Sequence, residues 1–201
     1  MAKFGAIGCV VILVLAVILG LVVAGTYNSL NTLDQEVRAQ WGQVENVYQR
    51  RADLVPNLVE IVKGAANFEK DTYTQVAEAR SEVGKISGDA LKNVLNDPQA
   101  FERFQQAQAG LSSALSRLMA VAEAYPDLKA TANFRELQSQ LEGTENRISV
   151  ERRRFNETAQ AFNTKRNSFP TTIIAGFFPK FAEKPYFKAA EGADKAPQVK
   201  F

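Results

Sequence analysis

The chain has 201 residues, of which 46% are hydrophobic and 23% are charged, a globular composition that excludes a wholly disordered protein. Its 24 Lys and Arg residues against 22 Asp and Glu residues leave a net charge of +2, so the composition offers no basic surface for nucleic acid. Histidine is absent and Cys9 is the single cysteine, which excludes an intramolecular disulfide and most His- or Cys-dependent enzymes and metal sites. We therefore expect no catalytic residue, no metal site and no cofactor.

The N-terminal segment predicts a membrane anchor. Residues 4–25 are all apolar or glycine, and no charged residue occurs between Lys3 and Asp34. Such a run is long enough for a helix to cross a bilayer core of about 30 Å. The alternative is a cleaved signal peptide, but the apolar region of a signal peptide is shorter, at roughly 7–15 residues. We therefore predict that residues 1–26 form an uncleaved anchor that crosses the membrane once, and the charge on Lys3 favours an extracytoplasmic position for the rest of the chain.

Small residues follow one face of the predicted anchor. Ala16, Gly20 and Ala24 are spaced by four residues, and such a stripe allows two helices to approach closely in lipid. The simpler interpretation is chance, because Ala and Gly are common in membrane spans. Self-association through the stripe is the other hypothesis.

The remaining pattern is helical, without the two-residue alternation that is typical of strands. Apolar residues spaced by three and four predict helices over 27–52, 53–86, 98–125 and 127–169. Asp97 is a good N-cap, and Pro98 suits the first helical position of the third helix. The sequence thus predicts an all-α protein: one transmembrane helix followed by an antiparallel up-and-down four-helix bundle over residues 27–169, with packing similar to that of a coiled coil.

The junction between the first two predicted helices allows two interpretations. Asp53 can cap a new helix, and Pro56 is tolerated in its first turn. The alternative is one continuous helix kinked at Pro56, because the apolar spacing nearly continues through this region. We favour a chain reversal, because an antiparallel pair buries both apolar faces.

The segment after the last helix, residues 170–188, is rich in proline, aromatic residues and lysine. Aromatic rings and ammonium groups suit the lipid headgroup layer. The candidate membrane-interface residues are Phe177, Phe178, Phe181, Lys184, Tyr186 and Phe187. The alternative, of equal weight, is that these rings cover one end of the bundle. Residues 189–201 are polar, contain a proline and predict a flexible tail.

Several motifs occur along the chain after the anchor. The most specific is RRADLVPNLV at residues 50–59, and the others are YNSL at 27–30, VAEAR at 76–80, YPDLKA at 125–130, LEGTENRI at 141–148, RRFN at 153–156 and FN at 162–163. Together they resemble the LemA family of bacterial membrane proteins. Phe155 and Phe162 depart from the family pattern, in which tyrosine is expected before each asparagine. The resemblance implies a single anchor in the bacterial inner membrane, a four-helix up-and-down domain and, because some relatives look lipid-anchored, an extracytoplasmic location, but it implies no activity.

The RRADLVPNLV string provides most of the candidate interaction residues. Arg51 lies on the apolar face, so its stem should be buried and its guanidinium paired with Asp53, Glu142 or Glu145. We favour a structural clamp between helices, and the alternative is a recognition patch for an acidic peptide or a lipid headgroup. The candidates are Trp41, Arg50, Arg51, Asp53, Pro56, Asn57 and Glu145.

Two functions remain. The first is a membrane-anchored, non-enzymatic scaffold or adaptor in the cell envelope, whose helical bundle contacts copies of itself or another envelope protein. The alternative is a membrane-active protein that binds or remodels lipid through its aromatic C-terminal segment and helical body.

Overall fold

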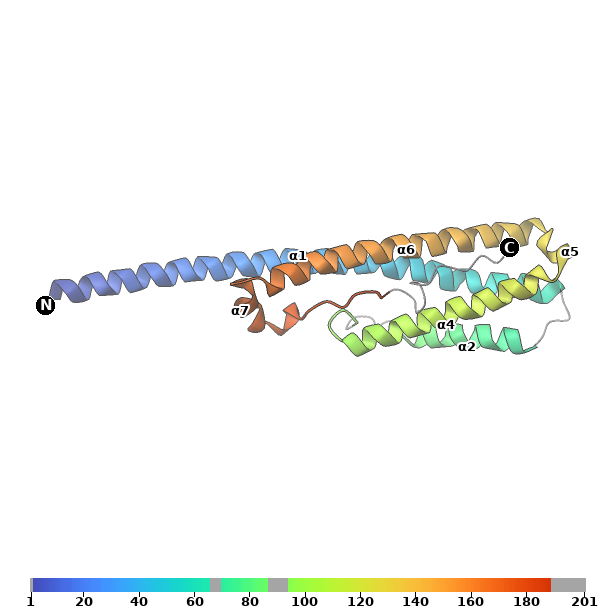
Figure 1. Ribbon diagram of the computed structural model, residues 1–201, viewed down its shortest axis with the longest axis horizontal. Coiled ribbons are helices and arrows are strands. Elements are labelled where there is room, and N and C mark those ends of the chain that lie inside the picture. Colours follow the sequence, from blue (N-terminus) through green and yellow to red (C-terminus); the bar gives the residue numbers. More distant parts are fainter. Residues whose placement is uncertain (1, 66–69, 87–93, 189–201) are drawn as a thin grey trace, which may run out of the picture.

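The computed structural model describes residues 2–65, 70–86 and 94–188, and these parts of the chain contain helices and no strand (Figure 1). In chain order, the elements are α1 (Ala2–Ala65), α2 (Lys70–Lys85), α4 (Pro98–Glu123), α5 (Pro126–Lys129), α6 (Ala132–Asn167), α7 (Thr171–Gly176) and the 3-10 helix η1 (Pro179–Phe181). The predicted all-α class and the long apolar N-terminal helix are confirmed. The predicted flexible tail, residues 189–201, lies outside the described residues.

The first helix, α1, runs without interruption from Ala2 to Ala65. The predicted chain reversal between Asp53 and Pro56 is therefore wrong, and Asp53 caps no helix. The buried face continues past both residues through Tyr48, Arg51, Val55, Leu58 and Val62. A proline inside a helix costs about 3 kcal/mol, whereas each fully buried aliphatic side chain contributes about 1.5–3 kcal/mol. Because Pro56 itself lies on the exposed side of α1, continuous packing of the buried face outweighs the lost backbone hydrogen bond.

The helices pack side by side in two main pairs. Figure 1 shows α6 lying along the C-terminal part of α1 and α2 lying along α4, and the most extensive contacts are within these pairs. Successive long helices run in opposite directions in the same view. The predicted regular four-helix bundle is not reproduced in full, because the described residues form six α-helices and the α1–α2 and α1–α4 contacts are sparse.

The predicted start of α4 is confirmed in detail. Asp97 adopts an extended backbone conformation, and its side chain accepts hydrogen bonds from the N–H groups of Gln99 and Ala100, while Pro98 occupies the first turn. The last long helix begins at Ala132, slightly after Asp127, which is the earliest predicted start. The chain first forms the short helix α5, and α6 then begins at Ala132, where the Thr131 side chain accepts a hydrogen bond from Phe134 N–H.

The core has two parts. An aliphatic cluster lies among α1, α2, α4, α5 and α6, and it includes Val55, Leu58, Val62, Val76, Leu111, Leu118 and Leu141. An aromatic cluster lies nearer the anchor, and it includes Trp41, Tyr48, Phe101, Phe104, Phe155, Phe162, Phe181 and Phe187. The last two rings come from the C-terminal segment, so this segment is part of the core.

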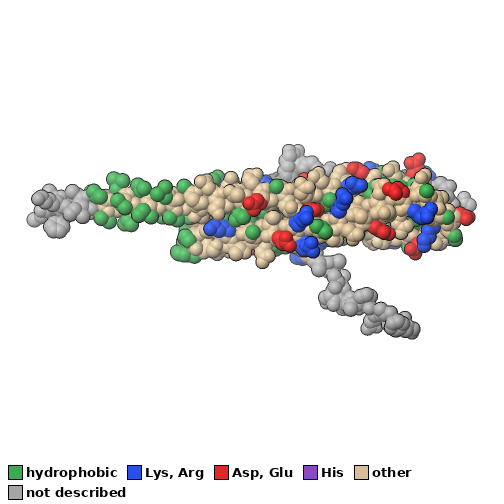
Figure 2. Space-filling view, turned by 90° about the horizontal axis from the view of Figure 1, so that it is seen from above, with side chains coloured by type: hydrophobic (Ala, Val, Ile, Leu, Met, Phe, Trp, Pro, Cys, Tyr) green, Lys and Arg blue, Asp and Glu red, His purple; other side chains and the backbone are tan. Residues whose placement is uncertain are grey.

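The N-terminal third of α1 extends beyond the rest of the molecule. Among the described residues, α1 is the one helix that is long and apolar enough to cross a membrane, and its side chains from Val10 to Val22 are exposed. Figure 2 shows hydrophobic side chains covering this part of the helix. The remaining helices, together with α1 from Tyr27 onward, form the body.

Candidate functional site

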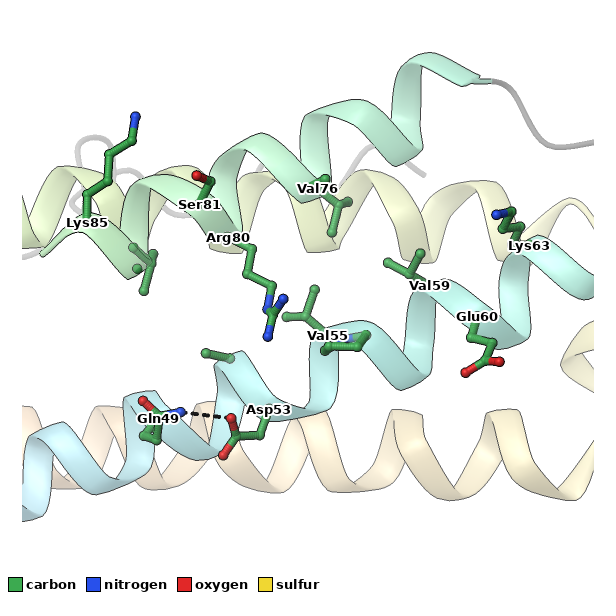
Figure 3. Close-up of a pocket in the computed structure, with 15 residues that line it drawn as sticks. Gln49, Asp53, Val55, Val59, Glu60, Lys63, Val76, Arg80, Ser81 and Lys85 are labelled. Atoms are coloured by element: carbon green, nitrogen blue, oxygen red, sulfur yellow. Dashed lines mark hydrogen bonds between the residues drawn. The ribbon is translucent and has the colours of Figure 1, made fainter. Parts of the chain in front are cut away.

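A groove of about 920 Å³ lies between α1 and α2 and is a candidate contact surface of the body. Its α1 wall carries Gln49, Ala52, Asp53, Val55, Pro56, Val59, Glu60 and Lys63. Its α2 wall carries Val76, Ala77, Arg80, Ser81, Val83, Gly84 and Lys85. Figure 3 shows the groove from the side, with Arg80 extending from α2 toward α1. We call this feature the α1–α2 groove.

The chemistry of the α1–α2 groove suits contact more than reaction. Its floor is made of valine, alanine and proline side chains, and its rim carries charges of both signs from Asp53, Glu60 and Arg80. The Asp53 carboxylate accepts a hydrogen bond of 2.8 Å from the Gln49 amide (Figure 3). In the described part of the chain, no group of three His, Cys, Asp or Glu side chains lies close enough together to hold a metal ion.

The structure divides the RRADLVPNLV string between two faces of α1. Asp53 and Pro56 line the α1–α2 groove, while Arg50 and Asn57 are exposed to solvent. Arg51, in contrast, points into the body and is 1% exposed. These residues do not meet at a helix turn, because α1 does not end there.

Arg51 connects three helices. Its guanidinium donates hydrogen bonds to Glu145 Oε1 at 2.9 Å, to Ser112 Oγ at 2.6 Å, and to the backbone carbonyl of Gln108 at 3.1 Å and that residue's side-chain oxygen. The guanidinium carbon also lies 5.1 Å from the centre of the Tyr48 ring. Of the predicted partners, Glu145 on α6 therefore pairs with Arg51, and Asp53 pairs elsewhere.

We expect Arg51→Ala to lower the free energy of unfolding by about 2–4 kcal/mol, because the buried side chain of Gln108 would lose its partner and a cavity would form. Half-exposed Glu145 can rehydrate, which limits the loss. Urea unfolding of the full chain in detergent would measure the change. Arg50→Ala removes the same charge from the neighbouring exposed position, and it should alter stability by less than about 0.5 kcal/mol. Equal unfolding midpoints for the two variants would contradict the clamp.

Side chains of α6 hold residues 182–188, which we call the C-terminal strap, in an irregular path along the body. Asn163 Nδ2 donates to the carbonyl of Lys184 at 2.9 Å, and Lys184 N–H donates to Asn163 Oδ1 at 2.8 Å. Asn156 pairs in the same way with both backbone groups of Phe187. Seven residues of helix rise about 10.5 Å, and three extended residues span about 10 Å, so the two asparagines match successive anchor points of the strap.

The strap places a lysine inside the body. Lys184 is buried, and its Nζ lies 2.7 Å from Asp34 Oδ1 and donates to Asn96 Oδ1 at 2.9 Å. Arg38 contacts the other Asp34 oxygen at 2.8 Å. Burial alone would raise the pKa of Asp34, but hydrogen bonds from Arg38 and Lys184 bring it below the usual value. Burial lowers the pKa of Lys184, and Asp34 opposes part of that change.

The predicted membrane-interface residues fall into two groups. Phe181, Lys184 and Phe187 are buried in the body, so the expectation that they contact headgroups is wrong for these three. The asparagine pairing of the strap turns Lys184 and Phe187 toward the body, and Phe181, at the end of η1 just before the strap, packs in the aromatic cluster. Phe177 and Tyr186 are exposed, and Phe178 is partly buried against the core. For the buried rings Phe181 and Phe187, the alternative interpretation, in which the rings pack on the helices, describes the structure better.

The strap asparagines and the Asp34–Lys184 pair are site residues that were not predicted from the sequence. The available signal was the repeated Phe-Asn dipeptide at 155–156 and 162–163, in which each phenylalanine enters the core and each asparagine faces the strap. Phe155 and Phe162 are fully buried. They fill the core without the hydroxyl group that tyrosine, the expected residue, would add at each position.

Comparison with known proteins identifies the family. The model of the LemA family matches residues 40–201, which is well over half of the chain. The chain belongs to the LemA family. The match includes the α1–α2 groove, the Arg51 cluster and the C-terminal strap, while the apolar part of α1 precedes it.

Curated relatives of this LemA-family chain include magnetosome proteins. It is 27% identical over 182 residues to the magnetosome protein MamQ 2 of Paramagnetospirillum magneticum, covering 84% of this chain and 66% of that protein. It is 28% identical over 178 residues to MamQ of Magnetospirillum gryphiswaldense, covering 79% and 65%. It is 24% identical over 154 residues to the protein LemA of Metamycoplasma hominis, covering 77% and 65%. The chain therefore spans just under two thirds of the length of these relatives.

Proposed function

We propose that this protein is a non-enzymatic adaptor, anchored once in the bacterial inner membrane, whose helical body makes contacts on the extracytoplasmic side. The continuity of α1 carries the proposal, because one helix provides both the exposed apolar segment and a buried face of the body. Such a chain cannot release its body from the anchor by bending at a linker. Membership of the LemA family supports this reading.

The contacts that we propose are with another envelope protein or with a second copy. The α1–α2 groove offers an apolar floor with a charged rim, the composition typical of a contact surface. The stripe of Ala16, Gly20 and Ala24 in the anchor is a second candidate for homo-oligomer contact. Gly20 has open space where a side chain would stand, so a neighbouring helix can approach its backbone.

Photo-crosslinking in intact cells tests the adaptor. A crosslinkable residue in place of Asp53 probes the groove, and the same residue in place of exposed Gln160 on α6 is the matched control. We expect position 53, and not position 160, to give a discrete adduct with one protein or with a second copy, identified by mass spectrometry. The absence of any adduct from position 53 would argue against contact through the groove.

The proposed side of the membrane has its own test. Reporter fusions at the C-terminus should be active only with an enzyme that works outside the cytoplasm. Activity of a cytoplasmic reporter would reverse the proposed orientation while leaving the anchor intact.

One observation favours a second candidate function, the binding or remodelling of lipid. Phe169, Ile173 and Phe177 are exposed around α7, whereas Phe187 in the strap is buried and not available to lipid. Remodelling predicts that vesicles carrying the full chain change size or shape in proportion to protein density. Vesicles that keep their shape would limit the role of these residues to attachment.

A further inference from the structure

The continuity of α1 fixes the distance of each residue from the bilayer. The apolar run of residues 4–25 has a helical length of about 33 Å, close to the hydrocarbon thickness of about 30 Å. The bilayer boundary therefore lies near Gly25, and Tyr27 stands on the next turn of the same helix. Any element packed on Tyr27 must lie at the level of the lipid headgroups.

The element packed on Tyr27 is the segment of α7 and η1. The Tyr27 ring lies 5.1 Å from the Phe178 ring and 5.4 Å from the Phe181 ring, both in edge-on geometry. Lys180 Nζ donates to the Tyr27 hydroxyl at 2.5 Å and to Asn31 Oδ1 at 3.1 Å. Figure 1 shows α7 beside α1, at the end of the body nearest the anchor. These contacts hold the segment against the first turns of α1 beyond the boundary.

Three large apolar side chains extend outward from this segment. Phe169 is 81% exposed, Ile173 is 56% exposed and Phe177 is 77% exposed, and they are spaced by four residues. Figure 2 shows hydrophobic surface at this end of the body, next to the anchor. Transfer of such side chains from water to an apolar environment is favourable. The neighbouring Lys180 provides a cation at the same level, which suits lipid phosphate.

We propose that Phe169, Ile173 and Phe177 insert into the headgroup layer beside the anchor and form a second membrane contact of the chain. The occupant of this surface is lipid, because the surface continues the exposed apolar face of the anchor and lies at the height of the headgroups. With two contacts, the anchor and α7, the rotation of the body about the axis of the anchor is set relative to the bilayer. This inference rests on the proposed membrane attachment.

Site-directed spin labelling of the full chain in phosphatidylcholine–phosphatidylglycerol vesicles tests the proposal. Cys9 is the single cysteine, so Cys9→Ser provides the background. Labels are placed through Ile173→Cys and Phe177→Cys at the test positions, through Ala161→Cys on the exposed face of α6, and through Leu13→Cys inside the anchor. Collision with oxygen, which concentrates in lipid, is compared with collision with a water-soluble nickel chelate.

We expect a higher oxygen-to-nickel ratio at positions 173 and 177 than at position 161, which lies six residues, or about 9 Å of helix, before the end of α6 at Asn167. Position 13 should give the highest ratio. A lipid-like ratio at position 13 with water-like ratios at 173 and 177 would overturn the second contact and leave the anchor in place. Water-like ratios at all positions would overturn the membrane attachment itself, and the second contact with it. Spin–spin broadening at 177 between copies would instead assign the surface to a second copy and overturn the lipid proposal.

Discussion

Replacement of Trp41 by alanine is expected to lower the free energy of unfolding by about 3–5 kcal/mol. Trp41 is buried, and its ring centre lies 5.2 Å from that of Phe104, 5.5 Å from Phe155, 5.8 Å from Phe101 and 6.1 Å from Phe187. These rings come from α4, α6 and the C-terminal strap, so the cavity would open where all of them meet α1. Far-UV circular dichroism during urea unfolding of the full chain in detergent would measure the loss.

The control for this prediction is Trp41→Phe. It keeps an aromatic ring in the cluster, removes the hydrogen bond from Trp41 Nε1 to Glu45 and leaves a smaller cavity, so its effect should be clearly smaller. If both variants unfold at the wild-type urea concentration, the aromatic cluster does not hold the strap and the helices together in the way described.

Lys184→Ala should have an effect of similar size, about 3–5 kcal/mol, because it leaves the Asp34 carboxylate buried with Arg38 as its remaining charged partner. The exposed Lys188→Ala, in the same strap, is the matched control. A double variant, Asp34→Leu with Lys184→Met, should recover much of the loss, since apolar pairs often replace buried ion pairs without cost. A double variant less stable than Lys184→Ala alone would contradict this account.

The same pair predicts a dependence on pH. The pKa of Asp34 is lower in the folded protein than in the unfolded chain, where it is about 3.9. Its stabilising contribution is therefore complete above the unfolded pKa and is lost as the pH falls through the folded pKa. Between pH 5 and strongly acidic solution, the wild type should lose more unfolding free energy than Asp34→Asn. Parallel pH profiles for the two proteins would contradict the pairing.

The regular parts of the fold were predictable because they depend on local patterns. The anchor, the helical faces and the Asp97–Pro98 helix start each follow from a few neighbouring residues. Pro56 misled the prediction because its effect depends on which side of the helix it occupies, and the exposed side tolerates it. The sequence narrowed the partners of Arg51 to three carboxylates, but only the packing of α1 against α6 selects Glu145.

The C-terminal strap was not predictable from periodicity. It has no regular repeat of its own, and its path is set by asparagine side chains on α6 that bind its backbone. Lys184 and Phe187 in the strap, like Phe181 just before it, match a membrane-surface pattern in the sequence although all three are buried in the body. Phe177 lies in a stretch of similar aromatic and lysine content but remains exposed to solvent. It follows the end of α7, where the chain turns back along the body.

The uninterrupted course of α1 also determines how far the body extends from the anchor. Forty residues separate Gly25 from Ala65, so in the proposed membrane attachment the far end of the helix stands about 60 Å above the bilayer surface when the axis is upright. The groove at residues 49–63 then lies at heights of roughly 36–57 Å, beyond small proteins lying flat on the same membrane. A change of 10° in the inclination of the membrane-embedded segment moves the distal tip by about 10 Å, because the helix extends about 60 Å beyond the bilayer. In the proposed attachment, the lipid thickness around the anchor therefore also sets the height of the distal tip.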